Sequence, residues 1–294
     1  MRVKHSTIAG TWYPSRAGEL RRTIDAWFAE ADVPAHPPLA VIVPHAGYQY
    51  SGSVAATAYA QWKHASCARV VILAPSHRSW FRGAVLPGLD AFETPLGRVE
   101  VDPSVAALAR LPLISIDLAP FRDEHSLEIQ LPFVQCVLPK ARIVPLLLGD
   151  LQPEDYPQLA ATMAVLEADE TVIVVSSDFT HYGWRFDYQP FPASDGDGVR
   201  AGLRALDMGA IEPILAGDAP RFRRYVAETG ITVCGRVPIA AFLSWMGSRC
   251  HGELLRYQTS IDVTGDYEHS VSYAAIAFSA APLPAGPRTK VKDE

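Results

Sequence analysis

Three runs of apolar residues predict the central strands of this chain, at residues 39–43, 69–74 and 171–175. A strand that is apolar on both faces is typical of a parallel sheet covered by helices on both sides. Pro44 and Pro75 end the first two runs, because proline cannot continue the hydrogen-bond ladder of a strand. The pattern therefore predicts an α/β fold whose central, largely parallel but mixed β-sheet is flanked by helices.

Helical spacing and turn residues place further elements between these strands. Residues 16–31 carry apolar side chains every three or four positions, which predicts an amphipathic helix. A second helix is expected at residues 51–62, capped by Ser51 or Ser53, and another over residues 123–133 with acidic residues in its first turn. Other strands are expected at residues 83–86, 98–101, 142–149, 252–261 and 270–278, the first two of them as a hairpin.

One domain is expected over residues 1–280, followed by a disordered tail at residues 281–294 that is rich in proline and charge. The formal net charge of -6 gives no electrostatic reason to expect nucleic acid as a partner. The apolar runs are much shorter than the ~18 residues that span a bilayer, so no membrane partner is expected. The four cysteines follow no C-x-x-C spacing, and a reducing cytoplasm is the expected location.

Residues capable of metal binding or acid–base chemistry follow each of the three strands. His45 and His77 come just after the prolines that end the first two strands, and Asp178 and His181 follow the third. One predicted crossover helix separates the first two strands, so we expect those strands to be adjacent. In open α/β sheets, ligands bind outside the carboxyl ends of parallel strands. These four residues are therefore predicted to form one site.

Cys234 is the candidate third metal ligand. It precedes Gly235 at a predicted helix start, where a thiol pKa is lowered and the metal-binding thiolate is favoured. Either His-His-Cys, or the two histidines with Glu128, would leave coordination positions open. Asp178 and His181 then suit the orientation of ligands and general acid–base work. The alternative interpretation is structural, with satisfied histidines and an inert core thiol.

Several short motifs in a fixed order carry a family resemblance. They are Ala-Gly-Thr-Trp-Tyr-Pro at 9–14, Pro-His-Ala-Gly-Tyr at 44–48 followed by Tyr50 and Gly52, Pro-Ser-His at 75–77, Asp-Glu-His-Ser at 123–126 with Glu128, Ser-Ser-Asp-Phe at 176–179 with His181, Cys-Gly-Arg at 234–236 with Pro238, and Ser-Val-Ser-Tyr-Ala at 270–274. Each motif is weak alone, but the ordered set is highly specific. From about Thr7 to Ser279 the chain resembles the Memo family, whose prokaryotic members are called AmmeMemoRadiSam system protein B.

The resemblance implies a fold related to the class III extradiol ring-cleaving dioxygenases. It also implies metal ligands at His45, His77 and Cys234, with Fe(II) as the expected ion and Cu or Zn as alternatives. The family carries a cysteine where those dioxygenases carry a carboxylate, which changes the charge and redox behaviour of the iron. Expected partners are an unidentified small molecule or peptide and the proteins of the AmmeMemoRadiSam system, a radical SAM protein and a companion.

Three functions are compatible with these residues. The first is a non-haem iron oxidoreductase acting on O2 or an oxidisable small molecule, with His181 and Asp178 as catalytic residues. The second is a binding or scaffold protein that recognises a peptide or partner through an ancestral pocket, and the third is a zinc metallohydrolase. The segment 123–128 is expected near the pocket without supplying a ligand. The residues expected to line the pocket are Trp12, Tyr48, Tyr50, His125, Glu128 and Arg236.

Overall fold

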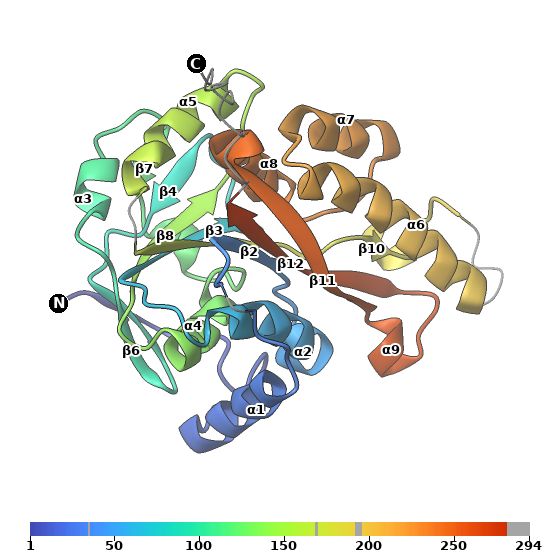
Figure 1. Ribbon diagram of the computed structural model, residues 1–294, viewed down its shortest axis with the longest axis horizontal. Coiled ribbons are helices and arrows are strands. Elements are labelled where there is room, and N and C mark those ends of the chain that lie inside the picture. Colours follow the sequence, from blue (N-terminus) through green and yellow to red (C-terminus); the bar gives the residue numbers. More distant parts are fainter. Residues whose placement is uncertain (35, 168–169, 192–195, 281–294) are drawn as a thin grey trace, which may run out of the picture.

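The computed structural model describes residues 1–34, 36–167, 170–191 and 196–280 (Figure 1). The tail predicted at residues 281–294 lies outside the described residues. Within them, a central sheet is covered by helices on both faces (Figure 1), which confirms the α/β class expected from the apolar runs. No helix in this part of the chain is both long enough and apolar enough to span a membrane.

The main sheet has a parallel centre and antiparallel edges. Its described strands follow the order β10-β12-β2-β9-β3-β8-β4-β7, and β11 pairs with β12 beside that path. The strands β2, β9, β3 and β8 run parallel to one another, whereas β4, β10, β11 and β12 join antiparallel neighbours. In chain order the strands are β2 (Ala40–Val43), β3 (Arg69–Pro75), β4 (Ala84–Leu86), β7 (Ile114–Ile116), β8 (Arg142–Leu148), β9 (Thr171–Ser176), β10 (His181–Tyr182), β11 (Cys250–Thr259) and β12 (Ser270–Ala280).

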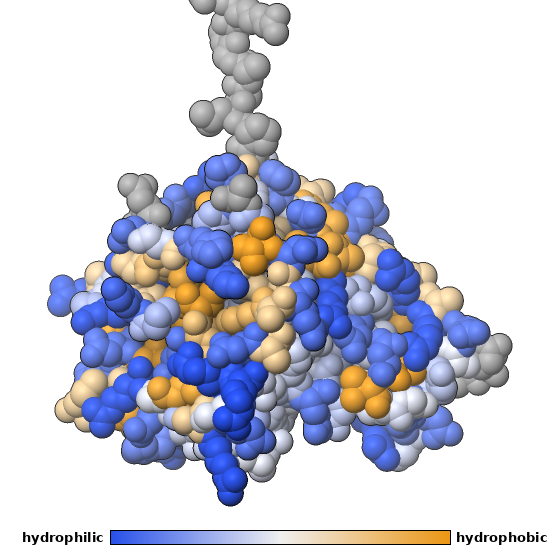
Figure 2. All heavy atoms as spheres, turned by 60° about the horizontal axis from the view of Figure 1, so that its bottom comes forward, coloured by the Kyte–Doolittle hydropathy of each residue, from blue (hydrophilic) through white to orange (hydrophobic). Residues whose placement is uncertain are grey.

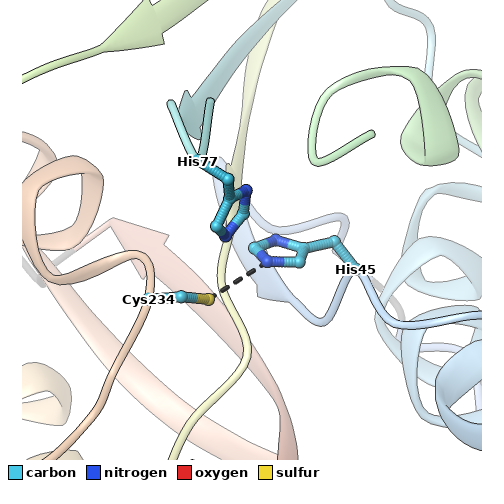
Figure 3. A group of neighbouring side chains, drawn as sticks. All are labelled: His45, His77 and Cys234. Atoms are coloured by element: carbon cyan, nitrogen blue, oxygen red, sulfur yellow. Dashed lines mark hydrogen bonds between the residues drawn. The ribbon is translucent and has the colours of Figure 1, made fainter. Parts of the chain in front are cut away.

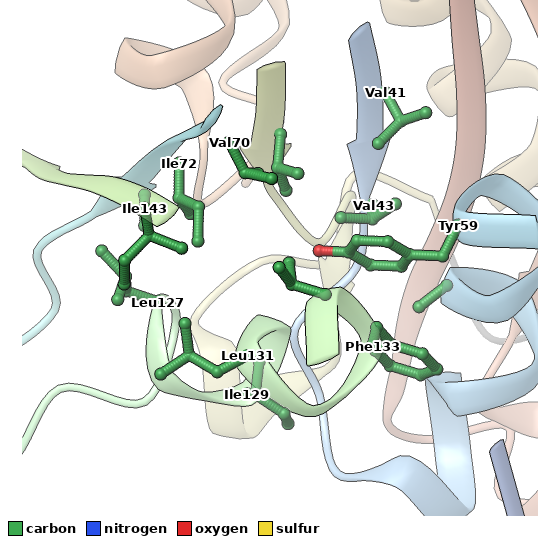
Figure 4. Close-up of a cluster of buried hydrophobic side chains, with 14 of the residues drawn as sticks. Val41, Val43, Tyr59, Val70, Ile72, Leu127, Ile129, Leu131, Phe133 and Ile143 are labelled. Atoms are coloured by element: carbon green, nitrogen blue, oxygen red, sulfur yellow. The ribbon is translucent and has the colours of Figure 1, made fainter. Parts of the chain in front are cut away.

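Alternate residues of each central strand enter two separate hydrophobic cores. In β2, Val41 and Val43 pack on one face of the sheet and Ala40 and Ile42 on the other, and all four are fully buried. Figure 4 shows the first of these cores, where strand residues meet the aromatic side chains of the covering helices. Burying one such aliphatic side chain contributes about 1.5–3 kcal/mol. Burial on both faces therefore explains why these strands are continuous apolar runs.

The helices form two layers, one on each face of the sheet (Figure 1). The first layer contains α1 (Ala17–Ala29), α2 (Tyr48–Tyr59) and α4 (Leu131–Val137). The second layer contains α5 (Asp155–Met163), α6 (Gly196–Leu215), α7 (Ala219–Thr229) and α8 (Arg236–Met246). The short helices are α3 (Val105–Leu108), α9 (Ile261–Thr264) and the 3-10 turns η1 (Ala60–Trp62), η2 (Ala119–Phe121), η3 (Glu128–Gln130), η4 (Ala164–Leu166), η5 (Trp184–Phe186) and η6 (Gly247–Arg249).

Several predicted elements differ from the structure. Helix α2 begins at Tyr48 after Gly47, so neither Ser51 nor Ser53 caps it; the hydroxyl of Ser51 donates to the backbone of Ala46 instead. The predicted hairpin is β5 (Ala91–Thr94) with β6 (Gly97–Glu100), and these two strands form a small second sheet with β1 (Val3–His5). The strand predicted at residues 83–86 is β4, which pairs with β8 in the main sheet and is not part of the hairpin.

The acidic segment at 123–128 is not a helix start. A turn and irregular backbone precede η3, and helix α4 begins only at Leu131. The acidic side chains of this segment are committed to tertiary contacts: Glu124 binds His77, and Glu128 binds the amino-terminal residues. These long-range hydrogen bonds override the local charge pattern from which the helix was predicted.

Polar side chains cover most of the face shown in Figure 2, and apolar residues appear there as separate patches. Such scattered apolar groups are normal for a folded protein surface. The largest exposed aromatic side chains of the described residues are Trp80 and Trp184, which are 93% and 63% exposed. Trp184 begins the turn η5 after β10, whose other residues, Arg185 and Phe186, line the site described next.

Candidate metal centre

Three strand ends bring the site residues to one edge of the sheet. His45, His77 and Asp178 each lie two residues beyond the end of β2, β3 and β9. The expectation that β2 and β3 are adjacent was wrong, because β9 lies between them and pairs in parallel with both. All three strands nevertheless end at the same edge, so the histidines converge across the end of β9.

His45 is buried and its ring is oriented by Ser176. The Ser176 hydroxyl donates to the carbonyl of Ser126 at 2.7 Å and accepts from the side chain of Gln130 at 2.9 Å. Its hydrogen is therefore committed, so the contact of 2.9 Å with His45 requires Nδ1–H as the donor. This tautomer leaves a lone pair on Nε2, the nitrogen that lies 3.1 Å from Cys234 Sγ.

His77 is held by the carboxylate of Glu124. The backbone N–H of His77 donates to Glu124 Oε2 at 2.6 Å, and the ring Nδ1 lies 2.9 Å from Oε1. Burial alone would raise the pKa of Glu124, but the hydrogen bonds and charge of His77, with the Ser126 amide, lower that pKa to about 2. An ionised carboxylate only accepts hydrogen bonds, so Nδ1 of His77 donates, and in the neutral imidazole this tautomer leaves the lone pair on Nε2.

Cys234 lies just before helix α8, with Gly235 at the amino-terminal cap. Burial raises the pKa of its thiol well above the usual value, and the charge of Asp178 raises it further. The prediction that this pKa would be lowered is therefore wrong, since burial and the charge of Asp178 outweigh the hydrogen bonds from the backbone of Asp178 and Gly235, which lower it. The backbone N–H of Asp178 does donate to Sγ at 3.1 Å, which fixes the position of the sulfur.

His45, His77 and Cys234 form a group whose ligand atoms all lie within 4.8 Å of one another (Figure 3). In Figure 3 the two rings and the thiol point toward one another from three separate segments of the chain. Metal–nitrogen and metal–sulfur bonds of about 2.0–2.3 Å can be met by side chains at this separation. The free Nε2 lone pairs and the sulfur are also the donor atoms that iron, copper and zinc accept. The residues present therefore fit a bound transition metal.

His77 also belongs to a second group of potential ligands, with Glu124 and His125. Glu124 in that group already accepts two hydrogen bonds from His77, so its role is to orient the imidazole. Burial lowers the pKa of His125 to about 4, against the opposing charge of Glu124. The His125 ring stacks on His77 with 4.7 Å between centroids and lies 4.2 Å from the Trp12 ring.

Asp178 lies in the loop after β9, and His181 is the first residue of β10, which follows that loop. Asp178 Oδ1 accepts the backbone N–H of His45 at 2.7 Å, and burial raises the pKa of this carboxyl group. The Nδ1 of His181 lies 2.9 Å from the carbonyl of Phe179 and 3.0 Å from that of Thr232. Since carbonyl oxygens only accept, Nδ1 carries a hydrogen, and in the neutral imidazole Nε2 holds the lone pair.

A cavity of about 460 Å³ opens beside His45 and His77 and has the size of a small-molecule site. Both histidine ligands, Asp178 and His181 line it, and so do three of the predicted lining residues, Trp12, Tyr50 and His125. Sequence reasoning missed other residues of its wall. These are chiefly Arg185, Phe186, Asp266, His269 and Tyr273.

Three predicted lining residues lie outside this cavity. Tyr48 is buried against Phe133, with its hydroxyl bonded to the carbonyl of Ile129. Glu128 is buried and accepts hydrogen bonds from Lys4 and Ser6 at 2.7 and 2.6 Å, which attaches the amino-terminal segment. Arg236 is exposed and lines a different cavity. Glu128 is therefore unavailable as the alternative metal ligand.

The residues missed by the sequence analysis carried weak signals. Glu124 stands in the 123–126 motif, where it was assigned to a helix start although it orients His77. Arg185 and Phe186 belong to the aromatic stretch after β10, whose path depends on tertiary packing. Ser176 ends a strand of apolar residues, and only its contact with His45 shows its role.

The fold and this cluster define an α/β protein with a candidate metal centre at the carboxyl edge of its sheet. Comparison with known proteins adds the family. A model of the family described as "Memo-like protein" matches residues 4–277, so the chain belongs to the Memo-like family.

The alignments with named relatives cover almost the whole chain. "Protein MEMO1" of Xenopus tropicalis is 33% identical over 290 residues, covering 94% of this chain and 97% of the relative. "Protein MEMO1" of Homo sapiens is 30% identical over 289 residues, with the same coverage. A MEMO1 family protein of Methanopyrus kandleri is 35% identical over 290 residues, covering 92% and 97%.

One solved structure, an uncharacterized protein of Escherichia coli K12, superposes with a TM-score of 0.46 at 12% identity. The superposition covers 82% of this chain and 99% of the Escherichia coli chain. This likeness is too slight to support an inference about function.

Proposed function

We propose that this protein is a metal-dependent oxidoreductase that acts on a small molecule in the cavity at the carboxyl edge of the sheet. The observation that carries the proposal is the group of His45, His77 and Cys234, whose ligand atoms lie within 4.8 Å of one another beside that cavity. Three protein ligands would leave positions on a bound metal for substrate. Fe(II) is the expected ion, and it would supply one-electron and oxygen chemistry.

The surrounding residues would orient the ligands and move a proton. Ser176 and Glu124 fix the two imidazoles with Nε2 toward the centre. His181 lines the same cavity with its Nδ1 held by backbone carbonyls, so Nε2 is placed to take a proton from a bound substrate. Asp178 holds the His45 backbone and the Cys234 sulfur in place.

The wall of the cavity favours a planar or apolar substrate. The rings of Trp12 and His125 pack together in a tilted arrangement on one side, and Tyr50, Phe186 and Tyr273 add aromatic surface. Such side chains exclude water and contribute to the binding of ring systems. The same wall favours the second candidate function, a non-catalytic protein that recognises a peptide through this pocket.

A combined assay tests the proposal. Metal analysis of protein purified without oxygen should find iron, and addition of O2 with a series of catechols and thiols should show substrate-dependent O2 consumption. Protein that contains iron but consumes no O2 with any of these compounds would favour the binding function. Stoichiometric zinc with hydrolysis of model esters would favour a metallohydrolase.

A further inference from the structure

A second cavity, of about 550 Å³, lies between helices α5, α7 and the start of α8. Its volume is within the range of small-molecule sites. Among the described residues it shares no part of its lining with the cavity of the candidate metal centre. We therefore consider its chemistry separately.

Arginines dominate the charged lining of this second cavity. Arg223 and Arg224 come from α7 and Arg236 from the first position of α8, and Asp150 is the one acidic residue in the described lining. In the described part of the chain, none of the three guanidinium groups has a hydrogen bond or ion pair. By contrast Arg221, also on α7, pairs with Glu212 at 2.9 Å.

Arg223 is the most constrained of the three. Its guanidinium lies over the ring of Tyr156, 4.6 Å from the centroid, and its Nε is buried without an acceptor among the described residues. Burial raises the pKa of Tyr156, whereas the positive charges of Arg223 and Arg236 lower it, so both guanidinium groups act on the same phenol. A buried N–H without an acceptor is uncommon in folded proteins and is costly.

The lining is suited to a doubly charged oxyanion attached to an apolar group. Guanidinium groups bind phosphate oxygens through paired, charge-assisted hydrogen bonds. Three positive groups facing one carboxylate favour a dianion over a single carboxylate. Tyr156, Phe222 and Val237 provide apolar surface for the remainder of the ligand.

We propose that this cavity binds a small molecule bearing a phosphate ester, with Arg223 and Arg236 as its principal phosphate ligands. Arg236 stands two residues after Cys234, and a smaller cavity of about 100 Å³ is lined by both of them. The phosphate site is therefore a near neighbour of the metal centre through Arg236, while its lining includes none of the candidate metal ligands.

Titration of the full chain with phenyl phosphate tests the proposal by isothermal calorimetry. We expect saturable binding that is at least about tenfold weaker in the double variant Arg223→Gln, Arg236→Gln, because hydrogen bonds to a charged group are lost. Phenol, which lacks the phosphate, should bind far more weakly. The matched control Arg221→Gln on α7 should bind as the unmodified protein does.

Two results would overturn the phosphate site. One is the absence of saturable phenyl phosphate binding, and the other is binding that the double variant leaves unchanged, which would place the ligand elsewhere. Thermal unfolding checks that each variant is folded. Arg223→Gln removes the contact with the Tyr156 ring and could unfold the chain. In that case the single variant Arg236→Gln, which changes an exposed residue, must still bind phenyl phosphate more weakly than the unmodified protein.

Discussion

The carboxylate of Glu124 holds His77 at two points, the backbone N–H at 2.6 Å and the ring Nδ1 at 2.9 Å. Removal of this support should leave the imidazole free to rotate and to change tautomer. We predict that Glu124→Gln lowers metal affinity by roughly 10- to 100-fold, the usual effect of losing such a partner. Competition with a chelator of known affinity measures the change. An unaltered dissociation constant would mean that His77 does not ligate the metal or needs no orientation.

Glu128 should affect stability and leave metal binding intact. Its buried carboxylate pairs with Lys4 at 2.7 Å and bonds to Ser6 and Thr7. We predict that Glu128→Ala lowers the free energy of unfolding by about 3–5 kcal/mol, because Lys4 is left buried without its partner. Urea unfolding gives the value, and the exposed Glu228→Ala is the control. Loss of metal from folded Glu128→Ala protein would restore this residue as a candidate ligand.

His181 should be dispensable for metal binding and required for turnover. Its imidazole lines the cavity, and it is not a member of either group of potential metal ligands. We predict that His181→Ala keeps its metal and loses roughly 10²–10⁴-fold in rate on any substrate that the O2 assay identifies. A variant that keeps its metal and turns over at the unmodified rate would leave His181 with a structural role only.

Asp207 gives a prediction about pH. Its buried side chain accepts hydrogen bonds from the Thr180 hydroxyl at 2.6 Å and the Tyr257 hydroxyl at 2.7 Å, and so steadies the loop between Asp178 and His181. Burial raises the pKa of Asp207 despite these hydrogen bonds. The folded chain therefore holds this proton more tightly than the unfolded chain does.

It follows that the stability contributed by Asp207 increases as the pH falls through its folded pKa toward the unfolded value of about 4. We predict that the free energy of unfolding of the unmodified protein, relative to Asp207→Asn, rises between pH 7 and pH 4. Urea titrations of both proteins at several pH values give the difference. A difference that shrinks as the pH falls would show that the folded state stabilises the ionised carboxylate.

The sequence predicted the parts of this fold that are set by burial. Strands such as β2 and β9 are buried on both faces, so their apolar runs were recognisable, and the prolines after β2 and at the end of β3 marked the strand ends beside His45 and His77. The order of strands was not recoverable from local pattern. The position of β9 between β2 and β3 depends on pairing between residues that lie more than a hundred positions apart in the chain.

The site was predictable only where residues stand next to a strand or helix end. The convergence of His45, His77 and Cys234 was expected from such positions and from the family resemblance, and the structure brings the three together. The partners of Glu124 and Glu128 were not predictable, because both carboxylates lie in one short segment and bind residues 47 and 122 positions away. The local charge pattern could not show that Glu124 orients His77 whereas Glu128 attaches the amino-terminal segment.

The most direct test of the metal centre is the metal content per folded chain of Cys234→Ala beside that of Cys250→Ala. Cys250 is also buried, but it lies at the start of β11 and is not a member of either group of potential metal ligands. Elemental analysis of protein prepared without oxygen should show that Cys250→Ala keeps the metal and Cys234→Ala loses most of it, as His45→Ala and His77→Ala should. Full metal content in Cys234→Ala would contradict the proposed ligand set and point to His125 as the third ligand.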